Sequence, residues 1–177
     1  MELHKILERK TLYSGPIFDL CQRVVELPNG KKVSRDVIEH KGASVIIAVT
    51  DPGDLVMVRQ YRNGTDSIML ELPAGKLDTG EDPQVCALRE LEEETGYKAS
   101  EIRLLLKMHP VAAYCSEEIS LFLAERLKPG VPKPDADEFV EVETYPLPEL
   151  LQLIDAGGIT DMKTILGLLY YSRMKGI

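Results

Sequence analysis

The first part of the chain has the apolar and polar alternation of extended strands. Residues 11–50 contain three extended runs, within "FDLCQRVVELPNGKKVSRDVIEHKGASVIIAVT". The first two runs are joined at "LPNGKK", where Asn29-Gly30 is a strong signal for a tight turn between antiparallel strands. The third, "SVIIAVT", is almost continuously apolar, which is typical of a strand buried on both faces. The pattern predicts an antiparallel β region followed by a central strand.

Further strands lead up to a helix. "DPGD" at 51–54 predicts a turn into "LVMVRQYR", and "IMLELPAG" follows until Pro73 and Gly75 end it. Asp82 then has the character of an N-cap, with Pro83 in the first turn, and Gly96 is suited to be the C-terminal cap. These signals predict a helix over residues 83–95.

The rest of the pattern decides the fold class. It predicts strands near 101–109, 119–126 and 139–145, and helices near 147–156 and 160–174. Strands outnumber helices and do not alternate regularly with them, which favours a mixed sheet between helical layers over a doubly wound sheet. The sequence therefore predicts an α/β protein of the α+β type, with an N-terminal antiparallel β region over 1–40 and a larger domain over 41–177.

The net charge of the chain excludes some classes of binding partner. The 29 acidic residues outnumber the 21 basic ones and give a formal net charge of −8. Nucleic acid and anionic membranes attract basic surfaces, so neither is expected as a partner. A phosphate substrate would need a cation between itself and this acidic protein.

Cysteine spacing and the N-terminal residues indicate a soluble cytoplasmic protein. Cys21, Cys86 and Cys115 lie far apart without a CxxC spacing, which favours reduced thiols over disulfides or a zinc site. The segment "MELHKILERK" lacks the apolar core of a signal peptide, and no apolar run approaches the roughly 18 residues that span a bilayer.

The predicted helix over 83–95 carries a cluster of glutamates. Glu90, Glu93 and Glu94 lie at i, i+3 and i+4 and share one face, whereas Glu92 falls outside it. An apolar stripe of Ala87, Leu88 and Leu91 would pack on the sheet. Oxygen ligands of this kind suit Mg²⁺, with Mn²⁺ as the second choice. The alternative for the glutamates is a solvated helix face on which they pair with Arg89. The neighbouring Cys86 is either a soft metal ligand or a small packing residue.

The segment "GKLDTGEDPQVCALRELEEETGY" resembles the signature of the Nudix hydrolase family, G-x5-E-x7-R-E-U-x-E-E-x-G-U. Only its last position departs, where Tyr97 replaces an aliphatic residue. The resemblance implies an α/β/α sandwich with a mixed sheet and cation-assisted substitution at the phosphorus of a nucleoside diphosphate derivative. It also implies a set of metal ligands and a pair of residues that hold them in place. The ligands are the Glu90, Glu93 and Glu94 carboxylates and the Ala74 carbonyl, and the supporting pair is Arg89 and Glu81.

Flanking segments resemble the ADP-ribose pyrophosphatase branch of that family. The similar segments are "ELPAGKLDTGEDP", "VRQYR", residues 27–49 and a proline at 110. The branch implies a general base on a later loop, for which the candidates in "PDADEFVEV" are Glu138, then Asp137 and Asp135. A polar surface loop is the alternative for each. Glu117 is a further candidate for an acid near the substrate. Relatives tend to have a glycine after the proline, and its absence after Pro110 leaves room for another diphosphate sugar as substrate.

Substrate contacts and a homodimer are expected from the same resemblance. Arg59 and Arg62 are candidates for binding the diphosphate, or else belong to a solvated strand edge. His40 and His109 show no partner pattern and are interpreted as structural. The dimer would use the N-terminal strands to complete an adenine site, with candidate interface residues Tyr13, Phe18 and Arg35.

Three functions follow from these features. The first is Mg²⁺-dependent hydrolysis of ADP-ribose to AMP and ribose 5-phosphate. The second is hydrolysis of another nucleoside diphosphate sugar or a dinucleotide. The third is a noncatalytic nucleotide-sensing module, which the complete set of glutamates disfavours.

Overall fold

The computed structural model describes residues 4–133 and 138–177. The chain forms two compact units. The first comprises the N-terminal residues up to Gly42 together with His109–Glu118, and the second comprises Ala43–Met108 with Ile119–Ile177. Two of the candidate bases, Asp135 and Asp137, lie outside the described residues.

The first unit contains a three-stranded antiparallel sheet in the order β1-β2-β3. Its strands are β1 (Lys5–Ser14), β2 (Asp19–Glu26) and β3 (Lys32–Glu39). The turn predicted at Asn29-Gly30 is confirmed, because the Gly30 N–H donates to the Leu27 carbonyl and Gly30 has a φ of 76°. The prediction that the strand region starts at residue 11 is wrong. Strand β1 begins six residues earlier, and its mostly exposed side chains give no apolar alternation that would reveal it.

The second unit is built on two sheets. The larger has the order β7-β4-β9-β8, with β4 and β9 parallel and the other pairs antiparallel, so the predicted mixed sheet is confirmed. The smaller has the order β10-β5-β6 and is antiparallel. The strands are β4 (Ala43–Ala48), β5 (Leu55–Arg62), β6 (Ser67–Glu71), β7 (Ala74–Lys76), β8 (Lys98–Met108), β9 (Ile119–Lys128) and β10 (Val140–Tyr145).

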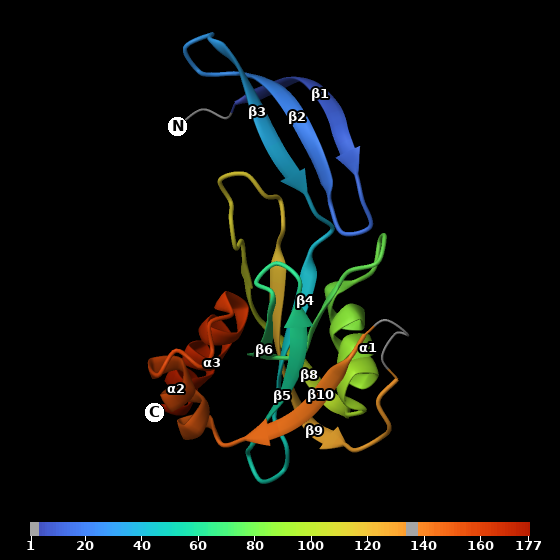
Figure 1. The fold of residues 1–177 in the computed structure, drawn as a ribbon, viewed down its shortest axis with the longest axis vertical. Coiled ribbons are helices and arrows are strands. Elements are labelled where there is room, and N and C mark those ends of the chain that lie inside the picture. Colours follow the sequence, from blue (N-terminus) through green and yellow to red (C-terminus); the bar gives the residue numbers. More distant parts are fainter. Residues whose placement is uncertain (1–3, 134–137) are drawn as a thin grey trace. The chain divides into compact units, whose positions relative to one another are not determined.

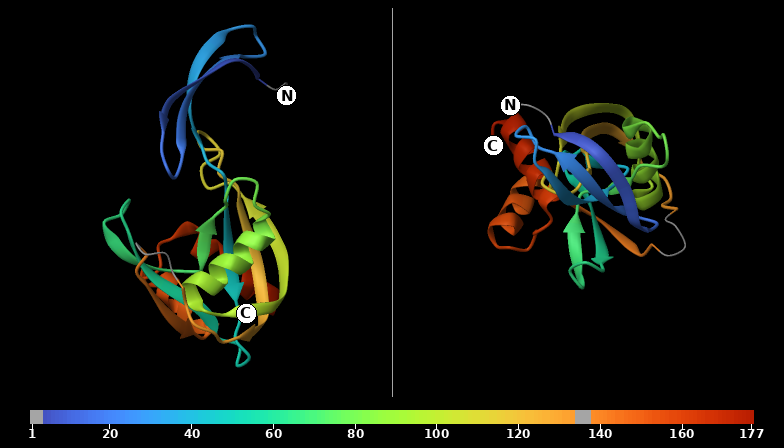
Figure 2. Two further views of the ribbon diagram at one scale, coloured as in Figure 1. Left: turned by 90° about the vertical axis from the view of Figure 1, so that its right-hand side faces the viewer. Right: turned by 90° about the horizontal axis from the view of Figure 1, so that it is seen from above.

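Helices cover both sides of these strands. Figures 1 and 2 show α1 (Pro83–Thr95) on one side and α2 (Leu147–Asp155) with α3 (Met162–Lys175) on the other. The alternation of β4 divides the core accordingly, because Ile46 packs in the cluster that contains Leu91 of α1, whereas Ile47 packs in the cluster that contains Leu168 of α3. The sheet therefore lies between two helical layers, as predicted. Among the described helices, none combines the length and apolar character needed to cross a membrane.

The predicted strand "IMLELPAG" is divided in two at Pro73. Strand β6 pairs with β5, whereas β7 pairs with β4, so the chain passes from the smaller sheet to the larger one at this point. Proline has no N–H to donate to a sheet, which explains why neither strand continues through it. The transfer brings the backbone of Ala74 and Gly75 against α1.

Helix α1 has the bounds that its sequence predicts. The Asp82 side chain accepts hydrogen bonds from the N–H groups of Gln84 (2.8 Å) and Val85 (3.3 Å), which caps the first turn. Gly96 ends the helix in the left-handed conformation with a φ of 75°. The acidic face of α1 is thus fixed at both ends.

Candidate active site

Two of the α1 glutamates are buried beside strand β7. Glu90 and Glu94 lie one turn apart and are 9% and 3% exposed, whereas Glu93 is partly exposed. Glu92, which was predicted to lie outside the cluster, pairs with Lys98 at 2.8 Å. The four glutamates therefore divide into a group facing β7 and a separate surface ion pair.

The backbone of β7 comes unusually close to these carboxylates. A Cβ atom at Gly75 would lie 1.7 Å from Cδ of Glu90, so only glycine leaves room for the Glu90 carboxylate. The Ala74 N–H donates to Oε2 of Glu94 at 3.1 Å. Strand β7 thus holds the two buried acids against the start of the loop that precedes α1.

Arg89 connects the acids to that loop. Its Nε and Nη2 each donate to Glu81 at 2.9 Å, and its Nη1 donates to Glu90 at 2.8 Å and to Glu93 at 2.9 Å. The hydrogen bonds from Arg89 lower the pKa of Glu81 to about 2. Glu81 also accepts the Asp78 N–H at 2.9 Å, so the loop and the helix are held by one charged network.

Burial sets the electrostatics of the two inner acids. It raises the pKa of Glu90, and it raises the pKa of Glu94 to about 8, in both cases with further contributions from neighbouring acids. Carboxylates whose ionised form is disfavoured in this way gain stability when a cation binds beside them.

The donor set fits a hard divalent cation. In residues 4–133 and 138–177, no three acidic, histidine or cysteine side chains are gathered tightly enough to hold a metal as they stand, and Arg89 pairs with two of the candidate ligands. However, Gly75 leaves room for the Glu90 carboxylate, and the Glu94 carboxylate lies against the neighbouring Ala74 backbone, so two carboxylates supply oxygen ligands at this point. Mg²⁺ and Mn²⁺ prefer such ligands. The role of Glu90, Glu93, Glu94 and Ala74 as metal ligands stays a prediction.

Cys86 has the surroundings of a packing residue. It is fully buried, and its Sγ lies 3.6 Å from the Gly75 carbonyl oxygen and 3.6 Å from Nη2 of Arg89. Burial raises the pKa of the thiol to about 11. A buried thiol in contact with a carbonyl oxygen and a guanidinium has the surroundings of a small packing residue.

Glu138 is electrostatically linked to the same acids. Its charge contributes to the raised pKa values of both Glu90 and Glu94, which places its carboxylate within electrostatic range of both. Of the three candidate bases, it is the one in the part of the chain that the structure describes.

The two arginines of "VRQYR" lie in different surroundings. Arg62 donates to both carboxylate oxygens of the buried Glu71, through Nε and Nη2 at 2.8 Å each. Arg59 donates to Glu143 at 2.7 Å and to the hydroxyl of Tyr145 at 3.2 Å. Arg62 interacts electrostatically with Glu94, whereas the largest interactions that shift the Arg59 pKa come from Glu143 and Tyr145. Arg62 is therefore the better-placed candidate for a phosphate contact.

The remaining candidates belong to the first unit. Arg35 is exposed and donates to the Ser34 carbonyl, while Pro110 and Glu117 lie in the segment His109–Glu118. The ring of His40 accepts the Gly42 N–H at 3.0 Å, and the ring of His109 lies 3.0 Å from the Glu117 carbonyl oxygen. Both histidines thus have local partners, in keeping with a structural role.

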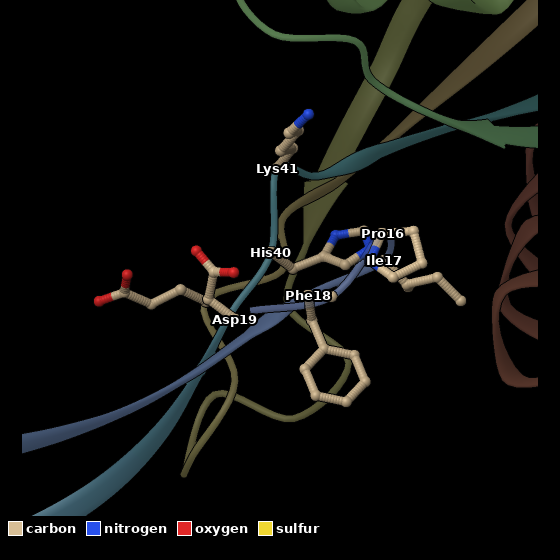
Figure 3. Close-up of a pocket in the computed structure, with 8 residues that line it drawn as sticks. Pro16, Ile17, Phe18, Asp19, His40 and Lys41 are labelled. Atoms are coloured by element: carbon tan, nitrogen blue, oxygen red, sulfur yellow. The ribbon is translucent and has the colours of Figure 1, made fainter. Parts of the chain in front are cut away.

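The first unit has a pocket of about 360 Å³ at the β1–β2 turn. Figure 3 shows the Asp19 carboxylate pointing away from the apolar side chains of Ile17 and Phe18, so the pocket has an apolar and a charged part. The lining residues are Gly15, Pro16, Ile17, Phe18, Asp19, Glu39, His40 and Lys41.

Sequence reasoning missed a second charged network beside Arg62. Glu71 is 1% exposed and pairs with both Arg62 and Lys163. A signal was present, because an acidic residue within the apolar run "IMLEL" needs a cationic partner if it is buried. No local pattern identifies Lys163, 92 positions further along the chain, as that partner.

Comparisons with known proteins agree with this architecture. The family model described as the NUDIX domain matches residues 40–164. The chain is 40% identical over 168 residues to an ADP-ribose pyrophosphatase of Bacillus subtilis, covering 94% of this chain and 91% of the relative. It is also 40% identical over 180 residues to a methanol dehydrogenase activator of Bacillus methanolicus, covering 98% and 97%.

A solved structure shares the fold. It is described as an ADP compounds hydrolase, and it superimposes with a TM-score of 0.84 at 24% identity, covering 99% of this chain and 97% of its own. Identity at this level supports the fold alone. Because the NUDIX domain model matches most of the chain and the relatives align over nearly their whole length, the chain belongs to the Nudix family.

Proposed function

We propose that this protein hydrolyses the diphosphate of ADP-ribose to AMP and ribose 5-phosphate, with Mg²⁺ as its cation. Nudix hydrolases generally depend on divalent metal ions. The observation that carries the proposal is the pair of buried carboxylates, Glu90 and Glu94, held against the glycine backbone of β7. The name and near-complete coverage of the Bacillus subtilis relative support the choice of ADP-ribose.

Each residue of the site has a role in this proposal. Bound cations would neutralise the diphosphate and activate water. Glu90, Glu93 and Glu94 would hold the cations together with the Ala74 carbonyl. Arg89 and Glu81 orient the carboxylates through the hydrogen bonds described above, which is the type of support on which metal sites depend.

Glu138 is the residue that we propose as general base. Its electrostatic link to Glu90 and Glu94 supports a position from which it can accept a proton from the attacking water. Asp137 and Asp135 remain the other candidates. Arg62 would bind the diphosphate through guanidinium donors that Glu71 does not occupy.

We further propose a homodimer in which the first unit supplies a nucleoside site. The pocket beside Phe18 supports this, because its apolar part suits a base and the carboxylates of Asp19 and Glu39 can accept hydrogen bonds from the hydroxyls of a ribose. Tyr13 and Arg35 are the other residues of that unit that we place at the interface. Tyr13 packs near Phe18, with ring centroids 6.0 Å apart.

A substrate panel tests the proposed activity. The two relatives described above are equally similar to this chain yet carry different names, so the substrate needs a direct assay. We expect ADP-ribose to have the highest kcat/KM when it is compared with GDP-mannose, UDP-glucose and NADH in the presence of Mg²⁺. A low rank for ADP-ribose would assign another nucleoside diphosphate substrate. Absence of hydrolysis across the panel would instead favour a noncatalytic nucleotide-sensing module.

A further inference from the structure

Glu71 of β6 is a buried carboxylate with two cationic partners. Both of its oxygens are engaged, because Arg62 donates to each of them at 2.8 Å and the Lys163 ammonium donates to Oε2. The side chain is 1% exposed. A buried charge of this kind is costly unless it is paired and hydrogen-bonded, so the three side chains form one interdependent unit.

Lys163 joins this unit to the start of helix α3. Its ammonium also donates to Asp161 at 2.9 Å, and the Asp161 carboxylate caps the helix by accepting the Thr164 N–H at 3.0 Å. The Thr164 hydroxyl accepts the Leu72 N–H at 2.9 Å. The first turn of α3 is therefore fastened to the last residue of β6 and to the residue after it.

The orientation of Arg62 follows from these contacts. Glu71 occupies Nε and Nη2, and within the described residues Nη1 has no hydrogen-bond partner. Successive side chains of a strand alternate, so Arg62 lies on the same face of β5 as Val56, which packs in the core cluster under α1. The electrostatic interaction between Arg62 and Glu94 agrees with this placement. The unoccupied edge of the guanidinium thus belongs to the side of the sheet that carries the α1 acids.

We propose that Glu71 and Lys163 are positioning residues that hold Arg62 ready to bind the diphosphate of the substrate. Glu71 fixes the plane of the guanidinium, so that Nη1 is presented without a search through the many rotamers of a free arginine. Lys163 anchors the Glu71 carboxylate and offsets its charge, which leaves the arginine attractive to an anion. The inference rests on the proposed function only in requiring a substrate that contains a diphosphate.

Binding of inorganic pyrophosphate in the presence of Mg²⁺, measured by calorimetry, tests this proposal. Lys163→Met should weaken binding about fivefold to tenfold, and Arg62→Lys should weaken it by a similar factor, because each disrupts the same charge-assisted contact. Lys163→Arg should keep binding within about twofold of wild type, because a positive charge remains beside the Glu71 carboxylate. Lys98→Met is the matched control, since it removes another lysine–glutamate pair and should leave binding unchanged.

The double variant Arg62→Lys/Lys163→Met separates positioning from general stabilisation. If Lys163 acts through Arg62, the double variant should bind pyrophosphate no more weakly than Arg62→Lys alone. In turnover, Lys163→Met should raise KM by the factor seen in binding and change kcat by less than about twofold, as expected when uniform binding energy is lost. Unfolding temperatures measured alongside would show whether each variant is folded at the assay temperature.

Three results would overturn the inference. The first is that Lys163→Met binds pyrophosphate as tightly as wild type. The second is that Lys163→Met weakens pyrophosphate binding by the same factor in the Arg62→Lys variant as in wild type. The third is that the wild type does not bind pyrophosphate. Failure of the proposed function is a separate result, because it appears as poor hydrolysis of ADP-ribose by the wild type whatever the pyrophosphate measurements show.

Discussion

Gly75 is the residue whose replacement most directly probes the geometry of the acids. An alanine Cβ would lie 1.7 Å from Cδ and 1.9 Å from Oε1 of Glu90, at the far end of a flexible side chain. The protein should therefore fold with Glu90 displaced. We expect Gly75→Ala to lower kcat on the order of 100-fold, as loss of a positioned ligand does, with only a small change in unfolding temperature.

Gly64→Ala is the control for this substitution. A Cβ at Gly64 would meet no atom within 4 Å, and its φ is not positive, so kcat should not change. Steady-state kinetics of both variants on ADP-ribose provide the comparison. Activity of Gly75→Ala within about twofold of wild type would mean that Glu90 is not needed where the structure places it.

At the scale of elements, Glu39 holds the three strands of the first sheet together. Its carboxylate accepts hydrogen bonds from Arg9 of β1 at 3.0 Å and from Arg23 of β2 at 2.6 Å. These bonds lower the pKa of Glu39 to about 2 from an ordinary value of 4.5, and the bond from Arg9 makes the largest contribution. A lowered pKa in the folded state means that the ionised group stabilises the fold above the ordinary value, and that this stabilisation is lost as the pH falls.

The expected pH dependence follows from that sign. Wild type should have a higher free energy of unfolding than Glu39→Gln at neutral pH, and the difference should shrink as the pH falls from about 4.5 toward about 2. Denaturant titrations of both proteins across this range measure the difference. A gap that is constant from pH 7 to pH 2 would show that the charge of Glu39 contributes nothing.

Elements differ in how far their sequences predict them. Helix α1 was predicted with its observed bounds because Asp82-Pro83 and Gly96 are local signals that act within a few residues. Strand β1 was missed at its start because its side chains face solvent and carry no apolar period. The division of "IMLELPAG" depends on which strands are its neighbours, and this is a property of the sheet topology that short-range patterns do not contain.

The candidate site shows the same division. The spacing of Glu90, Glu93 and Glu94 predicts that they share one face of the helix, and the family resemblance implies that Arg89 and Glu81 support them, which their hydrogen bonds allow. The contact between Glu71 and Lys163 joins residues 92 positions apart, and nothing in either local sequence identifies the other. The pairing of Arg59 with Glu143 is likewise a cross-strand contact that required the register of β5 and β10.

At the scale of the whole molecule, the first unit offers a surface for a second copy. Strand β1 is an edge strand, and edge strands are ready to pair with another chain. Ile6, Leu12 and Tyr13 on this strand are about half exposed. We expect the sedimenting species to have twice the 19.8 kDa mass of one chain. Leu12→Lys should shift the equilibrium toward the monomer, because burying the lysine charge in the interface would oppose association.

Analytical ultracentrifugation at micromolar concentration measures this equilibrium. Lys128→Ala, on strand β9 of the second unit, is a suitable control and should leave the dimer intact. A monomeric wild type would contradict the dimer and, with it, the proposed contribution of the Phe18 pocket to a partner's substrate site. It would leave the assignment of the α1 acids unaffected.

Cation-dependent hydrolysis of ADP-ribose is expected to depend on the α1 carboxylates. The most direct measurement is the rate of AMP formation with Mg²⁺, compared between wild type and Glu93→Gln/Glu94→Gln, with circular dichroism showing that the fold is kept. We predict that the substitutions, which remove two charges and little volume, lower the rate by at least about 100-fold. An unchanged rate in a folded double variant would show that these carboxylates are not needed for the hydrolysis.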